Sequence, residues 1–302
     1  MPSVSETNFS GLLHRGKVRD TYDIGNGRLL MIATDRISAF DVILPSPVPD
    51  KGTILAQMSN FWFDLTSDVM PNHVIGMADD KDALAEVPHT GALAELPEEM
   101  RRRSMVIRRA ERLNIECVVR GYITGAGWAE YSEHGTLNRQ KLPEGIVEAQ
   151  KLEPPIFTPS TKAEEGHDIP MTPSEVVDLV GVEMAATLEE VTLRIFEVAQ
   201  AYAAGRGMIV ADTKMEFGLI DGELTLIDEL FTADSSRFWT QSDYKPGASP
   251  PAFDKQFVRN WLLESGWDRE PPAPDLPADI IRMTRDRYIQ AFERLTGDTF
   301  VA

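Results

Sequence analysis

Six charged residues between Met208 and Trp239 have types and spacings that could do chemistry. They are Asp212, Lys214, Glu216, Asp228, Glu229 and Asp234. Two runs of β-forming residues carry them and flank Asp221-Gly222, the strongest short-range signal for a β-hairpin. Mg²⁺ at a nucleotide site is usually held by one or two carboxylates together with substrate phosphates and water. The stretch therefore predicts a metal site, although a solvated charged face is the alternative for any one of these residues.

The register of this hairpin decides which side chains meet. With a strict two-residue loop at Asp221-Gly222, Asp228 would lie on the apolar face. With a three-residue loop that begins at Ile220 and contains a left-handed, bulged Gly222, Asp228 joins the polar face instead. That polar face then carries Asp212, Lys214, Glu216 and Asp228. Only the bulged register makes the hairpin amphipathic, so we predict the bulged register.

Composition narrows the class of protein. The chain has 302 residues, 42% of them hydrophobic and 26% charged, which is ordinary for a globular enzyme of about two domains. A net charge of −18 argues against nucleic acid and anionic membranes as partners, so any phosphate site must gather basic residues locally. The single cysteine cannot form an internal disulfide, which fits a reducing compartment. Cys117 has apolar neighbours in the sequence, so we expect it to be a small hydrophobic residue of the core. With no membrane-span or signal-peptide pattern, we expect a cytoplasmic protein.

The elements that must position the charged residues follow from hydrophobic periodicity and turn residues. Strands are expected on both sides of Gly25-Asn26-Gly27 and over residues 104–110 and 116–120. Helices are expected over residues 53–67, 183–204 and 278–295, with a short helix around Phe257 and Trp261. A capping box of Thr172 and Glu175 predicts the start of a further helix. Residues 152–170 contain too many prolines for regular structure and, with Lys162, Glu164, His167 and Asp168, predict an active-site loop.

Basic side chains next to glycines or strand ends indicate where anions could bind. Gly16 and Lys17 suit a flexible hairpin over phosphates, and the alternative is a basic edge strand. Arg120 is followed by small residues that could open a helix N-terminus to an anion. Asp35 and Arg36 follow a buried strand, where binding groups are common, but they could simply pair with each other.

Six motifs in order resemble the phosphoribosylaminoimidazole-succinocarboxamide synthase (SAICAR synthetase) family over nearly the whole chain. They are GKVRDTYD, ATDRISAFDVILPSPVPDKG, IECVVRGYITG, FTPSTKAEEGHD, DTKMEFG and IDELFTADSSRFW. The resemblance implies an ATP-dependent, ADP-forming ligase of purine biosynthesis. Such an enzyme joins L-aspartate to the carboxylate of carboxyaminoimidazole ribotide (CAIR), and a transient acyl phosphate is the simplest way to activate that carboxylate. Its ligands would be CAIR, L-aspartate, ATP and Mg²⁺.

The resemblance also implies roles for individual residues. For catalysis it indicates Lys214, Glu216 and Asp228, of which Glu216 and Asp228 would bind the metal. For the nucleotide it indicates Gly16, Lys17, Val18, Arg19, Glu116, Val118, Lys214 and Asp228. For the other substrates it indicates Asp35, Arg36, Ser38, Arg120, Lys162, Asp212, Ser236 and Arg237. Some family members have a serine where this chain has Ala126, so a hydroxyl donor for the ribotide phosphate is missing here.

The fold that the resemblance implies is α+β, with a kinase-like or ATP-grasp-like nucleotide cleft. An N-terminal sheet domain (residues 1–112) would carry a glycine-containing flap over ATP. A larger α+β domain (residues 113–240) would carry the metal hairpin. A C-terminal helical tail (residues 241–302) would wrap the body, and long-form members imply a monomer. The rival functions are a small-molecule kinase with the same Mg-ATP site and a non-catalytic nucleotide-binding or scaffold protein.

Overall fold

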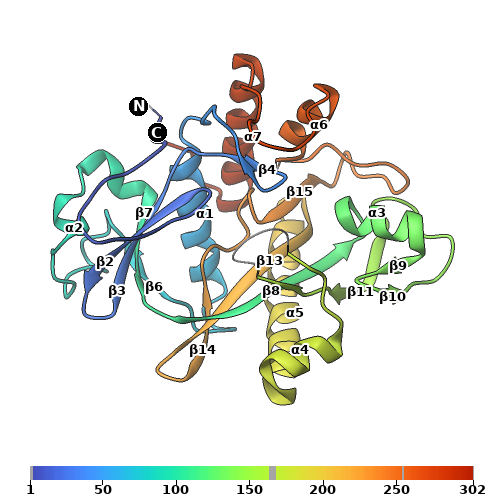
Figure 1. Ribbon diagram of the computed structural model, residues 1–302, viewed down its shortest axis with the longest axis horizontal. Helices are drawn as coiled ribbons and strands as arrows, with labels where there is room; N and C mark the ends of the chain where they lie inside the picture. Colours follow the sequence, from blue (N-terminus) through green and yellow to red (C-terminus); the bar gives the residue numbers. More distant parts are fainter. Residues whose placement is uncertain (1–2, 163–167, 254, 302) are drawn as a thin grey trace.

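The computed structural model describes residues 3–162, 168–253 and 255–301. Two antiparallel β-sheets, one built by the N-terminal part of the chain and one by its middle part, dominate the α+β fold (Figure 1). The helix α1 (Lys51–Leu65) contributes to the cores of both sheets, because Ala56 packs with the first and Trp62 with the second.

The first sheet has the strand order β1-β2-β3-β7-β6. Its strands are β1 (Leu12–Arg15), β2 (Arg19–Gly25), β3 (Arg28–Ala33), β7 (Ser104–Arg108) and β6 (Val74–Met77). The predicted turn lies between β2 and β3, where Asn26 and Gly27 both have positive φ angles, as a type I′ turn requires. The short helices α2 (Ala92–Glu95) and η1 (Glu98–Arg103) precede β7.

The second sheet has the order β11-β8-β13-β14, with β12 also paired to β8 and β15 to β13. Its strands are β8 (Glu111–Tyr122), β11 (Lys151–Phe157), β12 (Ser160–Thr161), β13 (Met208–Ile220), β14 (Glu223–Ile227) and β15 (Ser236–Thr240). The two long strands β8 and β13 form its centre. Two further pairs of short strands are β4 (Ser38–Ala39) with β5 (Val42–Ile43), and β9 (Thr136–Leu137) with β10 (Gln140–Lys141).

The predicted bulged register of the β13–β14 hairpin is wrong. Ile220 pairs directly with Glu223, and Asp221 and Gly222 both have positive φ angles, so the loop has two residues. The polar face nevertheless gains Asp228 by another route. Strand β14 ends at Ile227, and Asp228 adopts a left-handed conformation with φ 69°, which takes its side chain out of the alternation of the strand.

The expectation of no regular structure over residues 152–170 is also wrong in part. Strands β11 and β12 both pair with β8 in that segment. Prolines are tolerated there because β11 is an edge strand, and its register is irregular between Lys151 and Ile156, on either side of Pro154 and Pro155. Glu164 and His167 of the predicted loop lie outside the described residues.

Helices cover the second sheet and close the fold. Helix α4 (Pro173–Val180) begins with the predicted capping box of Thr172 and Glu175, which is confirmed. Helix α5 (Val182–Ala204) buries Phe196 against the second sheet, and α7 (Ala278–Thr296) adds Phe292 to the same core. The remaining helices are α3 (Gly125–His134) and α6 (Gln256–Glu264). Among the described residues, no helix has the length and apolarity that crossing a membrane requires.

Candidate active site

A cluster of four carboxylates lies where β8, β13 and the end of β14 meet. Glu116 of β8 and Glu216 of β13 are directly opposite each other across the two strands. The ammonium nitrogen of Lys162 bridges them, at 2.7 Å from Glu116 Oε1 and 2.6 Å from Glu216 Oε1. Lys214 Nζ donates a second hydrogen bond to Glu116 Oε1 at 2.9 Å. Like charges that would repel across the strands are thus held together by two lysines.

The other two carboxylates of this cluster share one arginine. Arg19, at the start of β2, donates to both oxygens of Asp228 at 2.5 and 2.7 Å. Its other terminal nitrogen lies 3.1 Å from Glu229 Oε1. A residue of the first sheet therefore reaches the end of the β13–β14 hairpin of the second sheet. We call Glu116, Glu216, Asp228 and Glu229, with Lys162, Lys214 and Arg19, the acidic group.

Burial and the neighbouring charges shift the pKa values of the carboxyls in the acidic group. Burial raises the pKa of Glu216, and the negative charge of Asp228 raises it further. Burial also opposes ionisation of Asp228, but the positive charges led by Arg19 outweigh it and lower the pKa of Asp228. For Glu116 the effect of burial is outweighed by Lys214 and Lys162, so the pKa falls. Two adjacent carboxyls with pKa values displaced in opposite directions are typical of functional sites.

A buried histidine borders the acidic group. His73 precedes β6, and its backbone N–H donates to Leu226 O of β14 at 3.1 Å. Burial lowers the pKa of His73 to about 4, although the nearby charge of Asp228 acts in the opposite direction. Its Nε2 atom has no hydrogen-bond partner within the described part of the chain. The neutral imidazole adds no positive charge that would compete for Asp228 at neutral pH.

The donor set fits a hard cation. Glu216 and Asp228 provide carboxylate oxygens close enough to influence each other's ionisation. Within residues 3–162, 168–253 and 255–301, no group of three or more potential ligand residues forms a complete metal cage. Mg²⁺ typically binds one or two carboxylates and completes its shell with phosphates and water. The acidic group therefore suits a metal that arrives with a nucleotide.

A second cluster lies four residues further along the same two strands. Asp212 of β13 pairs across to Arg120 of β8, whose Nη1 lies 3.0 Å from Asp212 Oδ2. Arg237 of β15 forms an ion pair with the same oxygen of Asp212. Arg120 Nε also donates to Thr158 Oγ1 at 3.2 Å. We call Arg120, Arg237 and Asp212 the arginine group, in which two cations share one carboxylate.

Helix α3 begins against this arginine group. The predicted helix start after Arg120 is confirmed, with Gly125 as the first residue of α3. A Cβ atom built on Gly125 would lie 2.5 Å from Arg237 Nη2, and the φ angle of Gly125 is +56°, so glycine is needed there. Backbone N–H groups at a helix N-terminus and two arginines therefore face the same region, and both favour an anion.

The predicted flap is a tight hairpin between β1 and β2. Gly16 N donates to Arg19 O at 2.7 Å, which closes the turn. Lys17 at its tip is exposed and pairs with Asp41 at 2.5 Å. The carbonyl of Val18 accepts both the backbone N–H and the hydroxyl of Thr34, each at 2.9 Å.

The alternative that Asp35 pairs with Arg36 is wrong. Asp35 is buried and accepts from Gly52 N at 2.9 Å and from Arg103 Nη1 at 3.0 Å. Arg36 pairs with the buried Asp20 at 2.7 Å and donates to the carbonyls of Ser5, Gly16 and Lys17. Arg36 thus ties the turn between β1 and β2 to the segment that follows β3. Ser38 is buried in the short strand β4.

Two further residues with predicted roles lie inside the sheet. The hydroxyl of Ser236 is 2.7 Å from that of Thr213, and both side chains are buried. The carbonyl of Val118 accepts from Thr158 N at 2.7 Å. Sequence reasoning gave no role to Glu229 or His73. The sequence could have indicated Glu229 as a site residue, since it follows Asp228 in a charged hairpin. It could not have indicated His73, because the residues that surround His73 come from distant segments of the chain.

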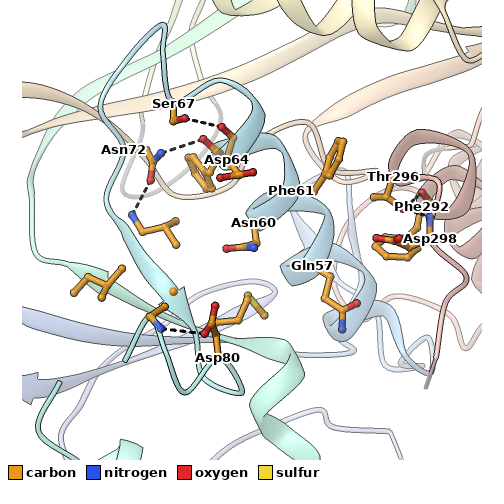
Figure 2. Close-up of a pocket in the computed structure, with 16 residues that line it drawn as sticks. Gln57, Asn60, Phe61, Asp64, Ser67, Asn72, Asp80, Phe292, Thr296 and Asp298 are labelled. Atoms are coloured by element: carbon orange, nitrogen blue, oxygen red, sulfur yellow. Dashed lines mark hydrogen bonds between the residues drawn. The ribbon is translucent and has the colours of Figure 1, made fainter. Parts of the chain in front are cut away.

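A cavity of about 520 Å³ is lined by residues that belong to neither cluster (Figure 2). Its wall comes from α1, from the segment around β6 and from the end of α7. Asp64, Asp80 and Asp298 line it, and none of the lining residues that the structure describes is a lysine or an arginine. Acidic walls disfavour phosphates, so we do not assign this cavity to a nucleotide.

Comparisons with known proteins identify the family to which the chain is similar. The family model described as SAICAR synthetase matches residues 12–274. A phosphoribosylaminoimidazole-succinocarboxamide synthase from Maridesulfovibrio salexigens is 48% identical over 286 residues, which are 94% of this chain and 93% of that one. Its counterpart from Thermodesulfovibrio yellowstonii is 48% identical over 97% of this chain and 99% of its own. The structure of "SAICAR-synthase from Saccharomyces cerevisiae complexed SAICAR" matches with a TM-score of 0.87 and 39% identity, covering 99% of this chain and 100% of that one.

Proposed function

The chain belongs to the SAICAR synthetase family, and from that premise we propose that it joins L-aspartate to CAIR with hydrolysis of ATP to ADP and phosphate. The product would be SAICAR, the ligand named in the yeast structure. The observation that carries the proposal is the pair of clusters on β8 and β13. One cluster suits a metal-bound nucleotide and the other suits a phosphate monoester.

The acidic group would bind ATP with Mg²⁺. Glu216 and Asp228 would hold the ion, whose bound charge would neutralise the phosphates during transfer. Arg19 would have to release Asp228 as the ion enters, and its position next to the flap would let it turn to the phosphates. Lys17 at the flap tip and Lys214 on β13 would add positive charge where the transferred phosphoryl group becomes more negative.

The arginine group would bind the 5′-phosphate of the ribotide. Asp212 holds Arg120 and Arg237 so that both guanidinium groups are fixed before the ligand arrives. Guanidinium groups form charge-assisted and often bidentate bonds to phosphate. Because the two groups lie on the same pair of strands, the ribotide carboxylate would point along the sheet toward the nucleotide.

The reaction would proceed in two steps. A carboxylate oxygen of CAIR would attack the γ-phosphorus of ATP, which forms a carboxylic–phosphoric anhydride and releases ADP. The amine of aspartate would then attack the acyl carbon and lose a proton, and inorganic phosphate would leave with the former carboxylate oxygen. No covalent bond to the protein is needed, and Cys117, whose pKa burial raises to about 12, is not suited to provide one.

The finer architecture is part of this proposal. We propose that residues 1–112 form the lobe that carries the flap and that residues 113–240 form the lobe that carries the metal hairpin. The division is supported by the strand composition of the two sheets. The C-terminal segment packs on both, because α7 joins the core of the second sheet while α6 joins a cluster with residues 37–48.

The test is turnover with CAIR whose carboxylate is labelled with ¹⁸O. ATP, Mg²⁺, CAIR and aspartate would each be omitted in turn. We expect ADP and ¹⁸O-labelled phosphate when all four are present. Unlabelled phosphate would exclude transfer to that carboxylate, and AMP with pyrophosphate would indicate an adenylating ligase. A stable phosphorylated product formed without aspartate would instead favour the rival small-molecule kinase.

A further inference from the structure

Glu130, a half-buried carboxylate of α3, connects this helix to the hairpin of β9 and β10. Its Oε1 atom accepts from Thr136 Oγ1 at 2.7 Å and from Arg139 N at 2.8 Å. Its Oε2 atom accepts from Asn138 N at 2.9 Å. In Figure 1 the hairpin lies beside α3. Three hydrogen bonds to one carboxylate therefore fix the hairpin relative to the helix.

The turn of this hairpin has a backbone that needs such support. Leu137 pairs directly with Gln140, so the loop consists of Asn138 and Arg139, whose φ angles are 52° and 62°. A left-handed backbone is tolerated by asparagine but is uncommon for most residues with a side chain. Strained turns persist where surrounding contacts hold them, and here the carboxylate of Glu130 accepts from the backbone N–H of both loop residues.

The residue before the turn carries this order to the arginine group. Leu137 is 2% exposed and packs in a hydrophobic cluster with Ile123 and Leu152. A Cβ atom built on Gly127 would lie 2.8 Å from Leu137 Cδ1 and 3.4 Å from Arg120 Cδ. Gly127 belongs to the first turn of α3, so the leucine and the stem of the arginine both lie against the same glycine. In a close-packed interior the position of Leu137 therefore sets how closely α3 approaches Arg120.

The tip of the hairpin is also attached to a second helix. Asn138 Nδ2 donates to Met171 O at 2.6 Å, just before α4. Arg139 forms an ion pair with Glu175, which belongs to the capping box of α4. The hairpin thus does not depend on α3 alone for its place in the fold. A change at Glu130 should therefore alter the shape of the turn while the hairpin stays folded.

Glu130 is also close enough to Arg120 for their charges to interact. Burial opposes ionisation of Glu130, but the three hydrogen bonds from the hairpin and the positive charge of Arg120 outweigh it and lower the pKa of Glu130. Burial lowers the pKa of Arg120, and the charge of Glu130 is one of the effects that oppose it. The carboxylate is therefore ionised at neutral pH, next to the proposed phosphate site.

We infer that Glu130 is a positioning residue for the ribotide phosphate. This inference rests on the proposed function, in which the arginine group and the start of α3 bind that phosphate. Glu130 itself does not contact the phosphate, because both of its oxygens accept hydrogen bonds from the hairpin. It fixes the turn, the turn fixes Leu137, and Leu137 fixes the distance from the first turn of α3 to Arg120. Donors on both sides of a phosphate must be held at a set separation to bind it together.

The test is Glu130→Gln in the full chain, with Kd for CAIR measured by calorimetry and KM for each substrate by steady-state kinetics. Glutamine keeps the length of the side chain but has one acceptor oxygen and no charge, so the turn loses at least one of its bonds. We expect Kd and KM for CAIR to rise about fivefold, while kcat and KM for ATP and aspartate stay within about twofold. Glu133→Gln, at an exposed position of the same helix, is the control and should change none of these values.

Leu137→Ala is the second variant and tests the same path one step nearer to Arg120. Shortening the side chain opens space beside Gly127, so Kd for CAIR should rise although Glu130 and its turn are unaltered. Leu142→Ala is the matched control, since Leu142 is half-buried and packs against the same hydrophobic cluster. The melting temperature should fall in both leucine variants, but the affinity for CAIR should fall only in Leu137→Ala.

Each result has a defined meaning. An unchanged Kd for CAIR in either Glu130→Gln or Leu137→Ala would overturn the inference. Equal rises in KM for CAIR, ATP and aspartate would overturn it as well, because Glu130 would then support the fold in general. Absence of CAIR binding and turnover in the unaltered protein would refute the proposed function, which is a different result from variants that bind CAIR as well as the unaltered protein does.

Discussion

Strands β8 and β13 carry two opposed pairs of charged residues, and the two pairs obey different rules. Arg120 opposite Asp212 is a pair of unlike charges that stabilises itself. Glu116 opposite Glu216 is a pair of like charges that needs Lys162 and Lys214 to exist. The two pairs are four residues apart along each strand. The Arg120–Asp212 pair needs no third group, whereas the Glu116–Glu216 pair depends on the two lysines. The repulsion between Glu116 and Glu216 lowers the stability of the fold, as is common at residues that bind a ligand.

The same comparison explains the charge of each cluster. In the acidic group four carboxylates meet three cations, which leaves a deficit of positive charge. In the arginine group two cations meet one carboxylate, which leaves a surplus. A metal ion suits the first and a phosphate suits the second. An acidic protein of net charge −18 can therefore still bind phosphates, since the surplus is local.

The largest effect is expected from Glu216→Gln. Turnover should fall by about a thousandfold, because the metal ion that would stabilise the transition state loses a charged carboxylate ligand. The melting temperature should stay the same or rise, since burial and Asp228 raise the pKa of Glu216 and thus disfavour its ionised form. Glu223→Gln, on the exposed part of β14, is the control. Turnover close to that of the control would refute the metal role.

Arg237→Lys tests the other cluster. A lysine keeps the charge but loses the planar fork, so KM for CAIR should rise about thirtyfold while KM for ATP stays constant. Steady-state kinetics with each substrate varied in turn would measure both values. Arg112→Lys, an exposed arginine on β8, should change neither. An equal rise in KM for CAIR and for ATP would contradict the proposal that the arginine group binds CAIR and the acidic group binds ATP.

His73→Asn tests whether the acidic group carries an acid-sensitive neighbour. The folded-state pKa of His73 is about 4, below the usual 6.5, so the unfolded chain binds the proton first and stability is lost as the pH falls below about 6.5. Between pH 7 and pH 5 this should amount to about 2 kcal/mol. Urea unfolding at both pH values should show a loss smaller by that amount in His73→Asn. The same loss in both proteins would contradict it.

The sequence predicts some of this site because local patterns encode it. The charged positions of β13, the turn at Asp221-Gly222 and the capping box at Thr172 are all readable from neighbours a few residues apart. The opposition of Glu116 and Glu216 is not, since it joins strands about a hundred residues apart in the chain. The face of Asp228 was predicted correctly through a wrong register, because its left-handed backbone leaves no pattern in the sequence.

Contacts made by the C-terminal segment were the hardest to predict. Lys255 lies in a proline-flanked stretch with no motif of its own. Its ion-pair partner Asp234 is 21 residues away, and Lys51, which pairs with the same carboxylate, is about 200 residues away. Burial turned an ordinary lysine into a perturbed one, and burial depends on the whole fold. The same holds for Arg36, whose partners are Asp20 and the carbonyls of Gly16 and Lys17 and not its neighbour Asp35.

The smallest effect is expected from Ala126→Ser, which tests the anion site of the arginine group directly. Ala126 is exposed in the first turn of α3, next to the glycine that packs on Arg237. A serine hydroxyl there should donate one hydrogen bond to the ribotide phosphate, which contributes about 1 kcal/mol and lowers KM for CAIR about fivefold. Ala129→Ser, also exposed on α3 but one turn further on, should have no effect. If both serines act alike, or neither does, the phosphate does not bind at the start of α3.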